Sequence, residues 1–205
     1  PHFPAVARQV VNILQRGHIA QRPFNDGLSA QAWTNMLVIF DYDRSYFRQE
    51  DIERFEQVKF KLDDALKSGD VIFAYDVFDV FRQRLAERWN FVTNFLANAI
   101  DFTVEESFDW KRRQAPWPAT LAEQDDLWRR RLKNEYLGFL ISREFDAEKK
   151  ATNTTAAVTN EAEVDAAKDE IEATPYVPEG GSVTQLPPQT PEQFIKKRYE
   201  RFKII

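Results

Sequence analysis

The sequence predicts an all-α fold: an irregular bundle of about six helices with a long low-complexity insertion before the last helix. Apolar residues recur at three- and four-residue spacing through most of the chain, as they do in amphipathic helices. Of the 28 aromatic residues, 24 lie in residues 1–145, one in 146–190 and three in 191–205. We therefore expect a helical domain over 1–145, a polar Ala/Thr/Glu/Pro-rich insertion or linker over 146–189, and a final helix over 190–205 that returns to the domain.

The composition excludes several classes of function. With 28 basic and 33 acidic residues the net charge is −5, which argues against a nucleic-acid partner, since such proteins normally show a basic excess. The absence of cysteine excludes disulfides and thiolate chemistry. No run approaches 18 apolar residues, so we expect no membrane span. The chain begins without an initiator Met and stops inside an apolar helical pattern, and we interpret it as a fragment of a longer protein.

The first predicted helix covers residues 4–16 and ends at Gly17, a residue suited to a helix C-terminus. Ser29 is expected to cap a second helix after a connector. The apolar face of the first helix holds Val6, Val10, Ile13 and Leu14, and that of the second holds Trp33, Met36, Leu37 and Phe40.

Asp41–Phe47 is predicted to be a turn, because the side chains of Asp41 and Asp43 can accept hydrogen bonds from nearby backbone amides. A third helix is predicted over residues 49–67. Ser68–Gly69–Asp70 is expected to end it, with the aspartate as the cap of the next helix.

The fourth predicted helix, over residues 71–98, is the longest. We expect it to be central because it is apolar over more than a third of its circumference. Its apolar stripe is predicted to contain Val71, Ala74, Phe78, Phe81, Leu85, Val92 and Phe95, widened by Ile72, Tyr75, Trp89 and Leu96.

A short proline-flanked segment follows. Pro116 and Pro118 restrict the backbone on either side of Trp117, so residues 115–118 are predicted to form a stiff, extended strap. We expect Trp117 to be buried as a wedge between the fourth and fifth helices. Thr120 with a glutamate three residues later predicts a capping box that opens the fifth helix, over 121–145. The buried side of that helix is expected to hold Trp128, Leu132, Tyr136, Phe139 and Leu140.

Residues 146–189 consist largely of Ala, Thr, Glu, Asp, Pro and Gly, which favours a linker or surface insertion with a short helix near 161–173. Because the segment lacks bulky apolar side chains, we expect it to be dispensable for stability. Thr190, Pro191 and Gln193 predict a second capping box at the start of the last helix.

The residues that could carry chemistry favour no catalytic, cofactor or metal site. His2 and His18 are the only histidines, and they lack metal-site spacing. Adjacent carboxylates on a helix diverge by about 100°. We therefore interpret the acidic pairs as solvated or loop charges; they are Asp63–Asp64, Glu105–Glu106 and Asp125–Asp126. The basic runs Trp128–Arg131 and Lys196–Arg198 are interpreted as outer helix faces rather than phosphate sites, because acidic residues lie within a turn.

Most aromatic residues are expected in the core. Tyr42, Tyr46 and Phe47 are crowded into one turn where not all can be buried, and we expect at least two of them in the core. The structural or interface candidates are Tyr46, Phe47, Trp110, Trp117 and Trp128.

Several short motifs resemble, in order, the amino-terminal helical domain of tail-specific, or carboxy-terminal processing, serine proteases. They cover about 160 residues, and the insertion over 146–189 departs from the short connector that is common in that family. The motifs are Asp41–Phe55, Lys67–Tyr75, Asp101–Thr103, Ala115–Pro118, Glu123 with Leu127–Trp128, and Thr190–Phe202.

The resemblance implies a parent protein that is a bacterial periplasmic serine endopeptidase. Such proteases recognise unfolded proteins with apolar carboxy-termini through a PDZ domain and cleave them with a Ser–Lys dyad. Neither the PDZ domain nor a match to the dyad motif is present, so no residue of this chain is assigned a catalytic role. The resemblance implies a helical platform that packs on the PDZ and catalytic core and helps to hold substrate or an adaptor protein. The competing hypothesis is a stand-alone helical protein–protein interaction module.

Overall fold

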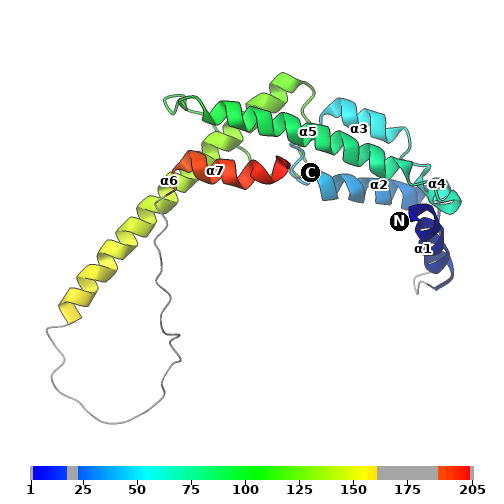
Figure 1. The fold of residues 1–205 in the computed structure, drawn as a ribbon, viewed down its shortest axis with the longest axis horizontal. Helices are drawn as coiled ribbons and strands as arrows, with labels where there is room; N and C mark the ends of the chain where they lie inside the picture. The colour runs from blue at the N-terminus through cyan, green and yellow to red at the C-terminus, as the bar shows by residue number, and fades with distance from the viewer. Residues whose placement is uncertain (1, 18–22, 161–188, 204–205) are drawn as a thin grey trace, which may run out of the picture. The chain divides into compact units, whose positions relative to one another are not determined.

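The computed structural model describes residues 2–17, 23–160 and 189–203, and within them it is all-α (Figure 1). The elements are α1 (Phe3–Gly17), α2 (Asp26–Phe40), α3 (Gln49–Glu56), α4 (Leu62–Ser68), α5 (Ile72–Leu96), α6 (Leu121–Asn160), α7 (Pro191–Glu200) and a 3₁₀ turn, Arg201–Lys203. The chain divides into two compact units, Pro1–Lys133 with Lys196–Ile205, and Asn134–Ile195. Among the described residues, no helix combines the length and the apolar character needed to cross a bilayer.

The core of the first unit lies between α2, α3, α4 and the N-terminal half of α5. In Figure 1, α2 and α3 run along that half of α5. The Trp33 indole on α2 donates to the Phe55 carbonyl of α3 at 3.0 Å, which fixes the two helices at the centre of the cluster. The fully packed apolar residues are Trp33, Leu37, Phe47, Ile52, Phe55, Leu62, Val77 and Val80.

The second helix begins earlier than predicted, and Ser29 does not cap it. The cap is Asn25, whose side chain accepts from the Leu28 amide at 3.3 Å. Ser29 is buried inside the helix, where its hydroxyl donates to Asp63 at 2.7 Å and accepts from the Asp63 amide at 2.8 Å. A serine can satisfy a tertiary partner as well as a cap, and sequence spacing does not distinguish the two uses.

The single helix predicted over 49–67 is also wrong, because residues 57–61 form turns that separate α3 from α4. The break allows α4 to pack against α1 and α2 while α3 keeps its contact with the core. The predicted stop at Ser68–Gly69–Asp70 is confirmed. Gly69 has φ +84° and a Cβ there would lie 2.8 Å from the Pro4 carbonyl oxygen, so glycine is required both by conformation and by the approach of α1.

The fourth predicted helix is confirmed as α5, but its predicted apolar stripe is partly wrong. Ile72, Tyr75 and Phe78 are exposed. The buried residues of α5 are Val77, Val80, Arg84, Leu85, Arg88 and Val92. The two arginines are buried because they meet acidic partners on other helices, which a count of apolar residues does not detect.

The capping box predicted at α7 has both expected hydrogen bonds, whereas the one predicted at α6 has one of the two. The Glu123 amide donates to the Thr120 hydroxyl at 3.1 Å, and the Glu123 carboxylate accepts from the Ala119 amide, one residue before the cap, at 2.8 Å. At α7 the box is reciprocal, with Thr190 and Gln193 exchanging bonds of 3.2 and 3.1 Å. Local spacing therefore determined where α6 and α7 begin.

The second unit contains the later part of α6 and the beginning of α7. The helix predicted to end at residue 145 continues to Asn160, and the short helix predicted near 161–173 lies outside the described residues. The Tyr136 hydroxyl donates to Glu192 at 2.8 Å, and the Phe139 and Phe194 rings lie 4.9 Å apart. These contacts hold the start of α7 beside α6.

Candidate functional site

The buried carboxylate of Asp41 organises the turn Asp41–Phe47, which we call the aspartate turn. It accepts from the backbone amides of Ser45 at 2.7 Å, Tyr46 at 3.2 Å and Phe47 at 3.0 Å. The predicted role of Asp41 in bonding nearby amides is thus confirmed. Arg44 within the turn has φ +49°, a left-handed conformation that the surrounding hydrogen bonds maintain.

Asp41 is almost completely enclosed, with 2% of its surface exposed. Burial raises the pKa of Asp41 above its ordinary value, and the amide hydrogen bonds of the turn together with the Trp117 side chain oppose that rise. The carboxylate therefore acts as an acceptor for the protein's own donors. Its geometry supports a structural role rather than general base catalysis.

The strap, residues 115–118, is bound along the aspartate turn. Arg44 donates to the Ala115 carbonyl at 2.7 Å, and its guanidinium lies 4.2 Å from the centroid of the Trp117 ring. The Trp117 indole donates to Asp41 at 3.1 Å, and the Gln49 amide donates to the Pro118 carbonyl at 2.9 Å. The strap is thus a second layer over the turn.

The expectation of a fully buried wedge between the fourth and fifth helices is wrong in the burial of Trp117. Trp117 is only partly buried and packs against the core cluster of α2 to α5. Its polar and cationic contacts are with Asp41 and Arg44. The two prolines fixed the local backbone, but the partner of the ring was chosen by tertiary structure.

Helix α6 closes the aspartate turn from the other side. The Gln124 side chain donates to the carbonyls of Ser45 at 3.1 Å and Tyr46 at 2.6 Å, and the Trp128 indole donates to the Ser45 carbonyl at 2.8 Å. Both side chains are fully buried. The backbone polar groups of the turn are therefore satisfied by residues about 80 positions away.

An aromatic cluster surrounds Trp128 where the chain returns through α7. The rings of Tyr46, Tyr199 and Phe202 lie 5.5, 5.4 and 6.4 Å from the Trp128 ring, in edge-to-face arrangements. Edge-to-face packing adds to the burial energy of such rings. The cluster joins the turn, α6 and the end of α7.

Four of the five candidate residues meet at this site. Phe47 and Trp128 are fully buried, and Tyr46 and Trp117 are partly buried. Trp110 lies apart, 69% exposed, with Lys111 5.0 Å above its ring. Gln124 was not predicted from the sequence, because a single glutamine within a helix gives no signal of a buried role.

The charged residues around Arg84 form a second structural site that sequence reasoning missed. Arg84 donates to both oxygens of Asp51 at 2.8 Å and also pairs with Glu50 and Glu87. Burial lowers the pKa of Arg84, but hydrogen bonds and charge attraction outweigh that effect, so its pKa is raised. Asp51 additionally accepts from the Arg48 amide at 2.9 Å at the start of α3. The pair fixes α3 on α5.

The interpretation of the acidic pairs as solvated charges is wrong for one member, and a second, Asp125, is only partly exposed and pairs with a buried arginine. Asp63 is buried and bound by Ser29 and Lys67. Asp125 pairs at 2.6 Å with Arg88, which is only 2% exposed. A carboxylate predicted to be solvated can thus be buried by a tertiary hydrogen bond, as Asp63 is by Ser29, or can neutralise a buried cation, as Asp125 does for Arg88.

Glu106 belongs to an ion-pair cluster rather than to a carboxylate pair. It accepts from Arg129 at 2.8 Å and from Lys133 at 2.6 Å. These two cations lower the pKa of Glu106 from 4.5 to about 2. The basic run at 129–131 is laced with acids, as predicted, but one of its partners lies 23 residues away.

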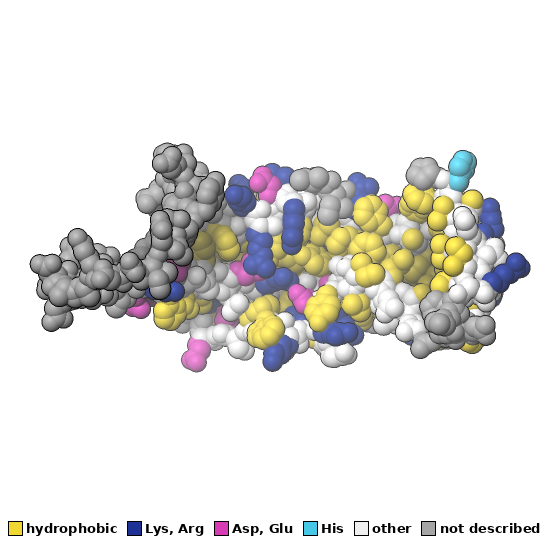
Figure 2. All heavy atoms as spheres, turned by 90° about the horizontal axis from the view of Figure 1, so that it is seen from below, with side chains coloured by type: hydrophobic (Ala, Val, Ile, Leu, Met, Phe, Trp, Pro, Cys, Tyr) yellow, Lys and Arg dark blue, Asp and Glu magenta, His cyan; other side chains and the backbone are white. Residues whose placement is uncertain are grey.

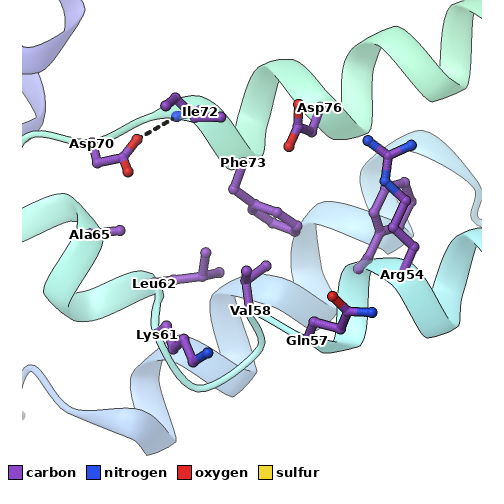
Figure 3. Close-up of a pocket in the computed structure, with 11 residues that line it drawn as sticks. Arg54, Gln57, Val58, Lys61, Leu62, Ala65, Asp70, Ile72, Phe73 and Asp76 are labelled. Atoms are coloured by element: carbon purple, nitrogen blue, oxygen red, sulfur yellow. Dashed lines mark hydrogen bonds between the residues drawn. The ribbon is translucent and has the colours of Figure 1, made fainter.

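A hollow of about 360 Å³ lies between the α3–α4 turn and the start of α5 (Figure 3). Val58, Leu62 and Phe73 line it with apolar surface, and Phe73 points into the space. Charged side chains of both signs surround them; these are Arg54, Lys61, Asp70 and Asp76. The hollow is a surface depression with mixed charge, unlike a pocket with convergent catalytic groups.

No group of histidine and acidic residues within the described part of the chain has metal-ligand geometry. His2 is exposed at the start of α1, and the expectation for His18 lies outside the described residues. The site around the aspartate turn is a junction, since hydrogen bonds join the turn to the strap and to α6 there.

Comparison with known proteins shows the family to which the chain belongs. The family described as the tail specific protease N-terminal domain matches residues 10–179. The chain belongs to this family. A tail-specific protease of Haemophilus influenzae is 28% identical over 130 residues, which are 62% of this chain and 19% of that protein. The match thus covers about a fifth of the relative's length.

The predicted resemblance to the N-terminal domain of tail-specific proteases is confirmed. Its motifs at Asp41–Phe55, Ala115–Pro118 and Leu127–Trp128 are far apart in sequence. In this tail-specific protease domain they meet at the aspartate turn. The motifs therefore have a common physical role, which is to join the helices.

Proposed function

We propose that the chain is the non-catalytic N-terminal helical platform of a bacterial, periplasmic carboxy-terminal processing serine endopeptidase. The platform packs on the PDZ and catalytic core and helps to hold unfolded substrates with apolar carboxy-termini, or an adaptor protein. The observation that carries the proposal is the match of residues 10–179 to the N-terminal domain of tail-specific proteases.

The side-chain geometry supports a platform rather than an active site. Three of the described serines, Ser29, Ser45 and Ser68, have hydroxyls bonded to Asp63, Arg131 and the Ala65 carbonyl, and none of these three bonds is to a lysine. A Ser–Lys dyad would instead require a serine hydroxyl within hydrogen-bond reach of a lysine amine. The polar atoms of the motif residues at the aspartate turn form hydrogen bonds with one another.

The proposal is tested with an unfolded protein that ends in an apolar tail. We expect the 205-residue chain alone to leave it intact, and the longer protease polypeptide to cleave it. Removing residues 1–205 from that polypeptide should reduce cleavage of this substrate, while a substrate with a charged tail serves as control. Reproducible cleavage by the 205-residue chain, lost on a point substitution within it, contradicts the proposal.

The rival proposal is a stand-alone helical interaction module, and the exposed apolar surface of α1 is the observation in its favour. The reading frame that encodes the chain discriminates between the two. A PDZ pattern and a Ser/Lys pair downstream of Ile205 support the platform, and a stop codon there supports the module.

A further inference from the structure

Helix α1 exposes the apolar face that its sequence would be expected to bury. The face consists of Phe3, Val6, Val10, Ile13 and Leu14, which are between 37% and 59% exposed. We call these five residues the α1 face. On the side of the molecule seen in Figure 2, apolar side chains gather over α1 at the right of the view. Val11 is the one buried residue of this helix.

The helix is attached to the domain by a different side. Arg8 donates to the Ser68 carbonyl at 3.0 Å, and Pro4 and Arg8 approach Gly69 closely. Val11 lies on the same side as these residues because it follows Arg8 by three and Pro4 by seven positions. The α1 face is turned away from this attachment, and the Phe3 ring meets the Tyr75 ring of α5 at 6.3 Å at its edge.

We propose that the α1 face docks against an apolar surface of the protease region in the same, longer polypeptide. This inference rests on the proposed function and adds the surface through which the platform packs. The face has no charged side chain among its five residues, so the partner surface must also be apolar and uncharged where the two meet.

The size of the face favours a covalently linked partner over a free one. A helix of 15 residues is about 22 Å long and about 10 Å wide, so its face offers roughly 200 Å². A stable complex between separate proteins buries about 800 Å² on each partner. A linked partner is present at an effective concentration of about 1 mM, so the small face suffices. A second copy of the chain lacks this advantage.

The charges disfavour a lipid surface. Arg8 and Arg16 are the only charged residues of α1, and Arg8 is bonded to the Ser68 carbonyl. Helices that lie on membranes carry several basic residues on the polar face, and anionic lipid repels a chain of net charge −5.

Hydrogen exchange of the α1 amides tests the proposal. The 205-residue chain is compared with the longer polypeptide that joins it to the protease region. In the shorter chain α1 should exchange quickly, since a 15-residue helix with one buried residue is marginal. In the longer polypeptide exchange should be slower by about tenfold or more, because docking adds tertiary protection.

Ile13→Asp, in the centre of the face, should restore rapid exchange of α1 in the longer polypeptide. Asn12→Asp is the matched control. It introduces the same residue one position away, on the exposed polar side, and should keep the protection. Loss of protection in both variants overturns the proposal, because the effect would then belong to the helix rather than to its face.

The remaining outcomes separate this inference from the proposed function. Protection of other surfaces without α1 overturns the inference alone. Protection of no surface on joining the protease region overturns both. If α1 of the shorter chain becomes protected as the protein concentration rises, the face binds a second copy of the chain. If it becomes protected on addition of phosphatidylglycerol vesicles, the face binds lipid. Either result overturns the inference.

Discussion

The aspartate turn and α1 differ in how the polarity of their residues relates to burial. The turn is short and rich in polar residues, yet Asp41, Ser45 and Phe47 in it are buried, because Asp41 within the turn and Gln124 and Trp128 of α6 satisfy its backbone groups. Helix α1 is strongly amphipathic, yet its apolar face is exposed. Burial in this domain is therefore decided by available partners, and apolar character alone does not place a residue inside. Substitutions in both regions test this contrast.

Replacing Arg84 by methionine should give the largest loss of stability. It leaves Asp51 buried without its cation, and breaking one side of a buried ion pair typically costs about 3–5 kcal/mol. Urea unfolding of the 205-residue chain measures the loss. Arg82→Met on the exposed side of α5 is the control and should change the free energy of unfolding by less than about 0.5 kcal/mol. Equal losses from both variants would show that the ion pair of Arg84 with Asp51 contributes no more to stability than an exposed arginine does.

Asp41→Ala should cost about 3 kcal/mol, because it leaves the amides of the aspartate turn and the Trp117 indole without their acceptor. Asp43→Ala, in the same turn but partly exposed, should cost less than about 1 kcal/mol. Thermal and urea unfolding compare the two. A small loss at Asp41 would mean that water replaces the carboxylate.

Trp117→Ala should cost about 2 kcal/mol, below the about 3–5 kcal/mol of a fully buried aromatic residue, since the ring is only partly buried. Trp117→Phe keeps most of the ring and removes the donor to Asp41, so about 1 kcal/mol is expected. Urea unfolding of both variants separates ring packing from the hydrogen bond. A loss below about 0.5 kcal/mol for the alanine variant would instead assign Trp117 to an interface.

Within α1, Val11→Ala should cost about 1–2 kcal/mol and Ile13→Ala less than about 0.5 kcal/mol in the 205-residue chain. Val11 is 5% exposed, whereas Ile13 is 59% exposed. The helical circular dichroism signal during urea unfolding measures both. A larger loss at Ile13 would show that the α1 face is already buried within this chain.

The acid dependence of stability should change at Glu106. Its folded pKa is lowered from 4.5 to about 2, so its ion pairs stabilise the fold above pH 4.5 and lose that effect as the pH falls toward 2. Glu106→Gln should therefore flatten the decline of stability between these values. Glu105→Gln, at the exposed neighbouring residue, should leave the decline unchanged. Unfolding curves from pH 5 to pH 2 test this prediction.

Features that depend on residues close in the chain could be predicted from the residue types alone. The boxes at Thr120 and Thr190, the stop at Gly69 and the amide bonds of Asp41 all join residues within a few positions. Their geometry follows from local spacing, so the residue types suffice to predict them. The all-α class follows in the same way from apolar periodicity.

Features that depend on distant partners could not be predicted in this way, because they require the folded structure. Arg84 and Arg88 are buried because Asp51 and Asp125 lie beside them, and Trp117 turns toward Asp41, 76 positions away. The α1 face is exposed because the domain binds the helix by another side. Each of these features depends on an interaction between groups that only the fold brings together. The residue pattern of one helix does not reveal the partner on another segment.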